Sequence, residues 1–334
     1  PMHRHLGNGG SIGMTAIQAL MSELIDFAGL FPPASLDMKT TVRGFAGYRE
    51  CPSAEVLGRL IIPVSRLDEF EQEAAGLLPR VPDLNGNEED PDPWAISALV
   101  CPASNLEMVA ADLEAIDGFN DRHTEEGAGA AIIDTIEIAA ASGEEIDGVL
   151  DILDDELYPY FELDWRGDVR GGVAAIAGLD GGAKIRTGGV IAGDHPGVLE
   201  VTRFIQACRM ADVPFKATAG LHHPIRADQS SVGTKQFGFL NVILGAAMLH
   251  AGVINGSELG ELLAEEDPRS FIFDQGTAGW RLHRIEMEPL LEARSRFVHS
   301  FGSCSFVEPL DELTALGMLA DAGTNSNQDG ESGT

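Results

Sequence analysis

Two lysines occupy consecutive strand-like runs in the second half of the chain. Lys184 lies in the run GAKIRT and Lys216 in the run PFKATA, and the 334 residues include only four lysines. Because strand side chains alternate in direction, Lys184 shares a face with Arg186, and Lys216 shares a face with Thr218, which we expect to contact the substrate. The alternate residues of the two runs, Ile185, Phe215 and Ala217, are apolar and should face a helical layer. The two amines are therefore expected to point into the interior of a closed sheet.

A buried lysine beside a second cation has a lowered pKa, and its neutral amine is a nucleophile toward carbonyl groups. We therefore expect Lys184 to form a Schiff base, with Lys216 and Arg186 supplying the neighbouring charge. Barrel interiors are normally filled with branched apolar residues, so charged residues there favour a functional site. The alternative is an internal salt-bridge network that only holds the barrel layers together.

Carboxylates are predicted near these amines on other strands. Glu162 and Asp164 share a face of the run YPYFELDW, Glu137 lies near the end of IIDTIEIA, and Asp26 lies in LIDFAGL. We expect Glu137, Glu162 or Asp164 to move protons during catalysis. Asp26 is expected to contribute to the binding of the substrate.

Adjacent histidines, His222 and His223, follow the run of Lys216. Barrel active sites lie in the loops after the strands, so either imidazole could act as a general acid or base, or could contact the substrate. A divalent metal held by one histidine with Glu162, Asp164 and Asp26 is an alternative, although adjacent side chains diverge and rarely bind one ion together. A structural role for both histidines is the third possibility.

Glycine-rich segments predict an anion-binding part of the site. The run SFIFDQ is followed by GTAGWR, whose small residues would leave backbone N–H groups open at a helix N-terminus. We expect Asp274, Gly276 and Arg281 in this segment, with Gly188 and Gly189, to contact a phosphate or carboxylate of the substrate. An ordinary glycine turn is the alternative.

The strings GAKIRTGG and FKATAG resemble the sixth and seventh strands of class I aldolases of the deoxyribose-phosphate aldolase type. The resemblance implies a barrel in which Lys184 forms the Schiff base. It also implies that Lys216 perturbs the pKa of Lys184 and that Glu137 moves protons.

The chain departs from that aldolase family at three points. Its fourth strand has Glu137 where the family has an aspartate, Arg186 lies close to the nucleophile, and the histidine pair has no counterpart. Longer strings, including FKATAGLHHP and SFGSCSF, are similar to a family of bacterial and archaeal proteins that carries no assigned activity.

Eight apolar, β-rich runs alternate with helical patterns, and this alternation predicts βα units in a parallel sheet. Eight such units close into an α/β fold, the (β/α)8 TIM barrel. The expected strands are residues 24–30, 58–64, 94–101, 132–139, 158–165, 182–187, 214–219 and 270–275. The expected helices include residues 67–78, 106–119, 143–153, 198–211, 237–251 and 281–297.

We expect one barrel domain over residues 14–320. Residues 1–13 are His- and Gly-rich and are expected to be a tag remnant or a disordered arm, and residues 321–334 a disordered tail. The strongly apolar segment 237–251 should pack on the barrel or serve the interface of a possible homo-oligomer.

Acidic residues dominate the composition. There are 53 acidic and 22 basic residues, giving a net charge of −31, while 44% of the residues are hydrophobic. Salt screens such self-repulsion, so the composition resembles that of halophilic proteins from a salt-loaded cytoplasm. A nucleic acid would be repelled, and no apolar run is long enough to span a membrane. The four scattered cysteines have no zinc spacing and fit a cytoplasmic location.

Three functions fit these observations. The first is a lyase of the aldolase type, which acts without a cofactor through an imine on a small carbonyl compound. Its substrate would be phosphorylated or carboxylated and bound by Arg186. The second is a metal-dependent isomerase or hydrolase that uses Glu162, Asp164 and His222 or His223. The third is a non-catalytic ligand-binding barrel.

Overall fold

The computed structural model describes residues 13–82 and 91–319. The barrel strands are β1 (Ile25–Phe27), β2 (Leu57–Pro63), β3 (Trp94–Leu99), β4 (Ala131–Ala139), β5 (Tyr158–Glu162), β6 (Gly182–Arg186), β7 (Phe215–Thr218) and β13 (Val298–Ser303). They close in the order β1-β13-β7-β6-β5-β4-β3-β2, and neighbouring strands are parallel. The predicted TIM-barrel fold is confirmed. The predicted tail and the predicted arm, except Gly13, lie outside the described residues.

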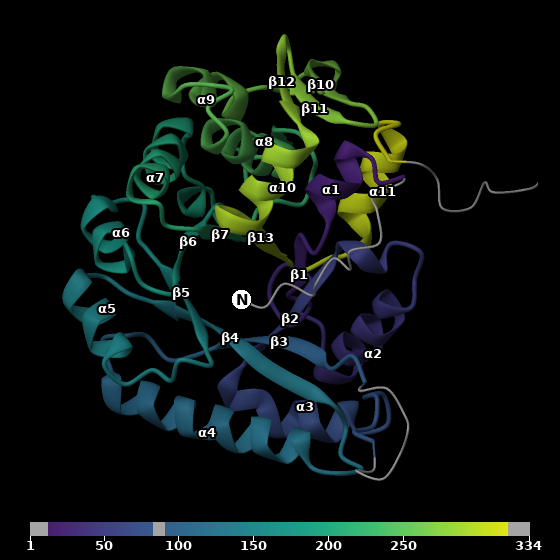
Figure 1. Cartoon of the computed structure of the whole chain (residues 1–334), viewed down its shortest axis with the longest axis vertical. Coiled ribbons are helices and arrows are strands. Elements are labelled where there is room, and N and C mark those ends of the chain that lie inside the picture. The colour runs from purple at the N-terminus through teal and green to yellow at the C-terminus, as the bar shows by residue number, and fades with distance from the viewer. Residues whose placement is uncertain (1–12, 83–90, 320–334) are drawn as a thin grey trace, which may run out of the picture.

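Helices surround the ring of strands (Figure 1). They are α1 (Ala16–Met21), α2 (Met38–Arg49), α3 (Leu67–Ala74), α4 (Leu106–Thr124), α5 (Gly143–Leu150), α6 (Arg170–Ile176), α7 (Val198–Ala211), α8 (Phe239–His250), α9 (Gly256–Leu263), α10 (Met287–Arg296) and α11 (Val307–Ala315). No helix in these two described ranges combines the length and the apolar character needed to traverse a lipid bilayer.

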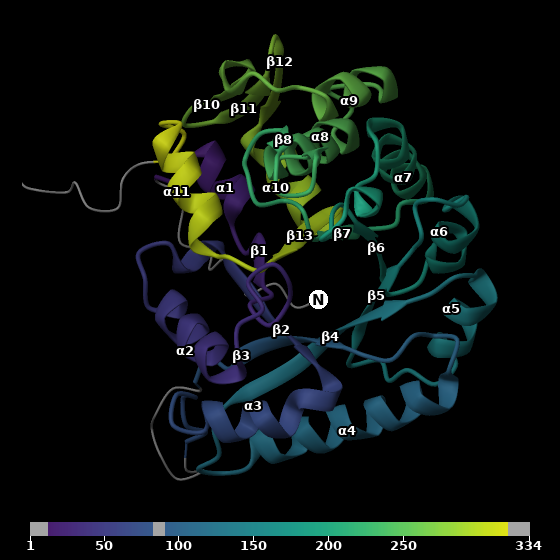
Figure 2. The same ribbon diagram turned by 180° about the vertical axis from the view of Figure 1, so that it is seen from behind.

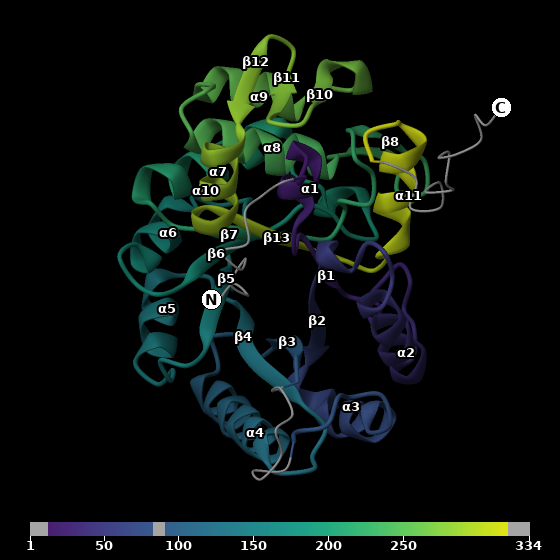
Figure 3. The ribbon, with the colours of Figure 1, turned by 45° about the vertical axis from the view of Figure 1, so that its right-hand side comes forward.

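The predicted eighth strand is wrong. Residues 270–275 contribute β10 (Phe271–Phe273) to an antiparallel sheet with β11 (Thr277–Trp280) and β12 (His283–Glu286), which lies outside the ring (Figure 3). The eighth barrel strand is β13, which pairs with β1 and β7. Its sequence VHSFGS is fully buried but partly polar. A short apolar run does not distinguish a barrel strand from a strand of an outer hairpin, so the apolar run of β10 was mistaken for the last barrel strand.

The apolar segment 237–251 is packed in the interior of the protein. Helix α8 is buried from Phe239 to Met248, and the ring of Phe239 stacks on that of Phe301 in β13 with centroids 5.5 Å apart. A helix that is apolar on all sides is typical of such a buried position. The alternative that this segment forms a subunit interface is therefore not supported, because α8 has no exposed apolar face.

Two glycines bring together the loops that follow β6 and β7. A Cβ atom on Gly188 would lie 2.5 Å from the Cα of Gly220, whose φ of +74° also favours glycine. Nearby, Thr187 donates a hydrogen bond from Oγ1 to the carbonyl oxygen of Ala219 at 2.5 Å. These contacts fix the mouth ends of the two strands that carry the lysines.

We predict that Gly188→Ala destabilises the protein by about 1–3 kcal/mol, because the new methyl group must displace backbone atoms. Gly193→Ala is the matched control, since nothing lies within 4 Å of a Cβ at that position of the same loop. Urea unfolding of the two variants measures the difference. Equal stabilities would show that the contact between the loops is not tight.

Candidate active site

The carboxylate of Glu137 joins both lysines inside the barrel. Its Oε2 lies 2.5 Å from Nζ of Lys184, and its Oε1 lies 2.7 Å from Nζ of Lys216. Ser97 donates a further hydrogen bond to Oε1 at 2.9 Å. The lysines are register partners on β6 and β7, and all three ionised side chains are at most 3% exposed. The two amines therefore share the barrel interior and one counter-ion.

Lys184 has a second carboxylate partner on the mouth side. Its Nζ lies 2.9 Å from Oε2 of Glu162, whose Oε1 accepts a hydrogen bond from Nε of Arg186 at 3.0 Å. The side chain of Glu162 is 20% exposed and that of Arg186 is 43% exposed, so the ion pairs run from the interior to solvent.

Lys216 has its second partner deeper in the barrel. Its Nζ lies 2.5 Å from Oδ2 of Asp26, which also accepts a hydrogen bond from Ser300 at 2.7 Å. The ring of Tyr160 lies beneath the ammonium, with its centroid 5.3 Å from Nζ, and its hydroxyl is 2.5 Å from Nδ1 of His299. Lys216 is therefore enclosed on all sides and does not reach the mouth.

The lysines hold Glu137 and Glu162 in their charged forms. Burial alone would raise the pKa of Glu137, but the ammonium groups of Lys184 and Lys216 outweigh burial and hold this pKa far below its usual range. Burial is likewise outweighed at Glu162, where Lys184 and Arg186 lower the pKa.

Lys216 is held as an ammonium. Burial alone would lower the pKa of Lys216, but the charges of Asp26 and Glu137 raise it. The lowered pKa that is expected of a buried lysine beside another cation therefore does not apply to Lys216, because two carboxylates contact it. It provides a permanent positive charge beside the Lys184 amine.

A cavity of about 440 Å³ opens at the mouth of the barrel over Lys184. Of the predicted site residues, it is lined by Glu137, Lys184, Arg186, Gly189, Thr218 and His222. A hairpin formed by β8 (Ala227–Gln229) and β9 (Thr234–Gln236) borders the cavity and lies near the viewer in Figure 2. The cavity combines a buried amine, carboxylates and access to solvent, which are the elements that a Schiff-base site needs.

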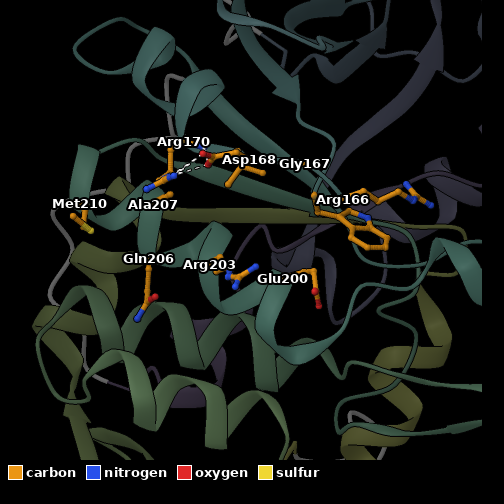
Figure 4. A pocket seen from close by; sticks show the side chains of 11 residues that line it. Arg166, Gly167, Asp168, Arg170, Glu200, Arg203, Gln206, Ala207 and Met210 are labelled. Carbon is orange, nitrogen blue, oxygen red and sulfur yellow. Dashed lines mark hydrogen bonds and ion pairs between the residues drawn. The ribbon is translucent and has the colours of Figure 1, made fainter.

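A larger hollow of about 750 Å³ lies on the outer side of the barrel, between the loop after β5 and helix α7 (Figure 4). Its lining contains surface charges that already pair, such as Arg170 with Asp168 at 2.6 Å. None of the charged residues of the barrel interior borders it. The smaller cavity is the better candidate, because buried ionisable groups mark functional sites more reliably than size does.

Three of the predicted acids do not line the cavity. Glu162 borders a separate hollow beside it, which Asp164 and Arg186 also line. Asp164 follows the end of β5, so strand alternation no longer governs its direction, and its exposed carboxylate contacts Arg166 at 3.3 Å. Asp26 lies beneath Lys216, below the layer that a substrate would contact. The prediction that Glu162 and Asp164 point into the barrel together is therefore wrong for Asp164.

The predicted anion site around Arg281 is not at the mouth. Asp274 and Gly276 lie in the turn between β10 and β11, where the Asp274 carboxylate accepts a hydrogen bond from the Gly276 N–H at 2.9 Å. Arg281 pairs with Glu261 and Glu265 at 2.8 and 3.0 Å. The prediction failed because it rested on the misassigned eighth strand, and residues 277–280 form a strand where a helix N-terminus was expected.

Of the remaining predicted residues, His223 and Gly188 do not line the cavity over Lys184. His223 turns away toward helix α11, and its Nδ1 lies 2.7 Å from Glu312. Gly188 packs against the neighbouring loop, whereas His222 and Gly189 line the cavity. His222 also reaches α11, where its Nδ1 lies 3.6 Å from Oε2 of Glu308.

The metal-ligand set predicted from the sequence does not assemble. Glu162 contacts two cations, Asp26 lies beneath Lys216, and neither groups with a histidine. In the described part of the chain, one set of potential ligand atoms lies within 4.8 Å of one another, and it consists of His223, Glu308 and Glu312 on the rim.

Several residues that support the amines were not predicted. Ser97, Tyr160, His299 and Ser300 contact the charged groups or enclose them. Tyr160 could have been found, since it lies two residues before Glu162 on β5 and so shares its face. His299 and Ser300 escaped notice because the polar strand β13 was not recognised.

The chain matches no protein-family model, and no curated protein is recognisably similar to it in sequence.

We predict that Glu137→Gln lowers the free energy of unfolding by about 3–5 kcal/mol at pH 7, because two buried ammonium groups lose their shared counter-ion. The charge of Glu137 contributes stability above its ordinary pKa of 4.5, and this contribution is lost as the pH falls through the lower folded-state value. Urea unfolding between pH 3 and 7 should therefore show a shallower acid dependence for the variant.

Glu69→Gln is the control for this experiment, since Glu69 forms an exposed ion pair with Arg66. Exposed pairs contribute about 0–1 kcal/mol, so this change should have little effect. A Glu137→Gln protein as stable as the control would contradict the central role of Glu137.

Proposed function

We propose that the protein is a lyase of the class I aldolase type, in which Lys184 forms a Schiff base with a small carbonyl compound. The observation that carries this proposal is the position of Lys184, a buried amine at the base of an open cavity with two carboxylates in contact. Lys216 lies behind it, Lys39 is on the exposed side of α2, and Lys235 pairs with Glu266.

Imine formation requires that Lys184 first gives up its extra proton. Glu162 is the better acceptor, because it contacts Nζ and is partly exposed, so the proton can pass on to water. The amine lone pair then forms a C–N bond with the carbonyl carbon, and the carbonyl oxygen leaves as water with the two remaining amine protons. Glu137 remains in contact with Nζ and holds the amine at the base of the cavity during this step.

Carbon–carbon cleavage would follow from the imine. Protonation of the imine nitrogen makes it an electron sink. A carboxylate removes the proton from a substrate hydroxyl, the adjacent C–C bond breaks, and its electron pair moves toward the iminium to give an enamine and a free aldehyde. We propose that Glu137 and Glu162 move these protons and that Arg186 contacts an anionic group of the substrate at the mouth.

The second candidate is a ligand-binding barrel without catalysis. It is favoured by the complete pairing of the interior, in which Arg186, Lys184 and Lys216 alternate with Glu162, Glu137 and Asp26. Such a network can favour one folded structure over alternatives without taking part in a reaction. Replacement of Lys184 separates the two candidates, since only a catalytic role needs a primary amine.

We predict that borohydride with a panel of aldehydes and ketones reduces an adduct onto Lys184, seen by intact mass and located by peptide mapping. Lys184→Arg keeps the positive charge but has no primary amine, so it should lose the adduct and stay folded. Lys235→Arg is the matched control and should keep the adduct. A modification confined to Lys39 or Lys235 would contradict the proposal.

We also propose that the protein works in the salt-rich cytoplasm of a halophile. A net charge of −31 supports this proposal, as do the four cysteines, all of which are free thiols.

We predict that raising KCl from about 0.1 M to about 1 M stabilises the protein, because the screening length falls from about 10 Å to about 3 Å. Urea unfolding at each salt concentration measures the gain, and sucrose of equal osmolality controls for general exclusion effects. A protein that is equally stable at both salt concentrations would contradict the proposal.

A further inference from the structure

The mouth of the barrel is divided into a charged half and an apolar half. In the ring, β4 to β7 are contiguous, and β13, β1, β2 and β3 form the other arc. The first arc supplies the charged lining residues Glu137, Lys184 and Arg186, and the loops after its strands add Asp194 and the apolar Val190, Ala219 and Val232. The second arc and the loops after its strands supply apolar residues, including Phe31, Pro33, Ile61, Leu99 and Gly302.

Lys184 faces the apolar half directly. In this eight-stranded ring, β6 and β2 are four positions apart, so Ile61 of β2 lies across the mouth from Lys184. A Cβ atom on Gly302 would lie 3.1 Å from both Ile61 Cδ1 and Thr218 Oγ1, so the glycine keeps this part of the cavity open. Any substituent on the carbon bound to Nζ must therefore extend over apolar side chains or back toward Arg186.

The charges around the cavity suit one negative charge rather than two. The cations of the lining are Lys184 and Arg186, and the carboxylates are Glu137 and Asp194. Burial lowers the pKa of His222, which favours its neutral form at pH 7. Arg186 is the cation near solvent and already shares its charge with Glu162. A phosphate dianion would be attracted by one available cation, Arg186, and repelled by the carboxylates of Glu137 and Asp194.

We infer that the substrate is an oxo acid with one carboxylate and an alkyl or aryl group, rather than a phosphorylated sugar. This inference rests on the proposed imine at Lys184. The carboxylate contacts Arg186, which lies two residues toward the mouth on the same face of β6. The apolar group packs on Ile61, Leu99 and Phe31, where its removal from water supplies binding energy.

Three 2-oxo acids test the inference with the same reacting group. Phenylpyruvate carries an aryl group, pyruvate a methyl group, and phosphohydroxypyruvate a phosphate. Borohydride trapping at Lys184 should be half-maximal at an about tenfold lower concentration for phenylpyruvate than for pyruvate, because binding removes the aryl group from water. Phosphohydroxypyruvate should be trapped no better than pyruvate.

A pair of leucine variants tests the apolar wall. Leu99→Asn should raise the phenylpyruvate concentration that gives half-maximal trapping by about fivefold to tenfold. The corresponding pyruvate concentration should stay the same, because only the aryl group contacts Leu99. Leu199→Asn, on the exposed surface of α7, is the matched control and should change neither. Equal responses of the two oxo acids to Leu99→Asn would overturn the apolar contact.

A thermal-shift assay with phenyllactate, which has no ketone or aldehyde group to form an imine, separates the two proposals. Preferential trapping of phosphohydroxypyruvate would overturn the inference and leave the Schiff base standing. A Leu99-dependent shift with phenyllactate, without trapping of any oxo acid, would overturn the proposed function and support the apolar carboxylate site. The absence of both trapping and shift would overturn both.

Discussion

The ion pairs of Glu137 with two lysines are the interaction on which the interior of this barrel depends. A TIM barrel normally fills its centre with apolar side chains, and here Glu137, Lys184 and Lys216 occupy that space. Each charge would be costly alone, but the carboxylate compensates both ammonium groups, and Asp26 and Glu162 compensate them from either side. Because each charge is paired, the charged layer can be buried in the barrel without the large free-energy cost of an unpaired ion.

The two lysines of this layer face different environments. Lys216 is enclosed by Asp26, Tyr160 and Ser300 and is held as an ammonium. Lys184 borders an open cavity of about 440 Å³. Two lysines that are register partners on neighbouring strands thus differ in what surrounds them, since one is a fixed charge and a ligand can reach the other.

The mouth adds a second asymmetry around the ring. Strands β4 to β7 carry the ionisable lining, whereas the strands and loops around β1 to β3 and β13 are apolar, and the hairpin β8–β9 borders the opening. The close contact of Gly188 with Gly220 joins the loops after β6 and β7. A bound molecule therefore meets a polar wall and an apolar wall at once, which defines its orientation as well as its charge.

The sequence by itself determined the barrel, its first seven strands and the placement of Lys184, Glu137 and Lys216 in its interior, because strand alternation and the βα pattern are local properties. It did not determine the last strand, since the partly polar β13 is buried in the barrel, whereas the apolar run of β10 belongs to an outer sheet. Likewise, only the tertiary structure decided that Lys216 is paired twice and that Asp164 and Arg281 lie outside the cavity. The distance between charges on different strands depends on ring closure, which no local pattern encodes.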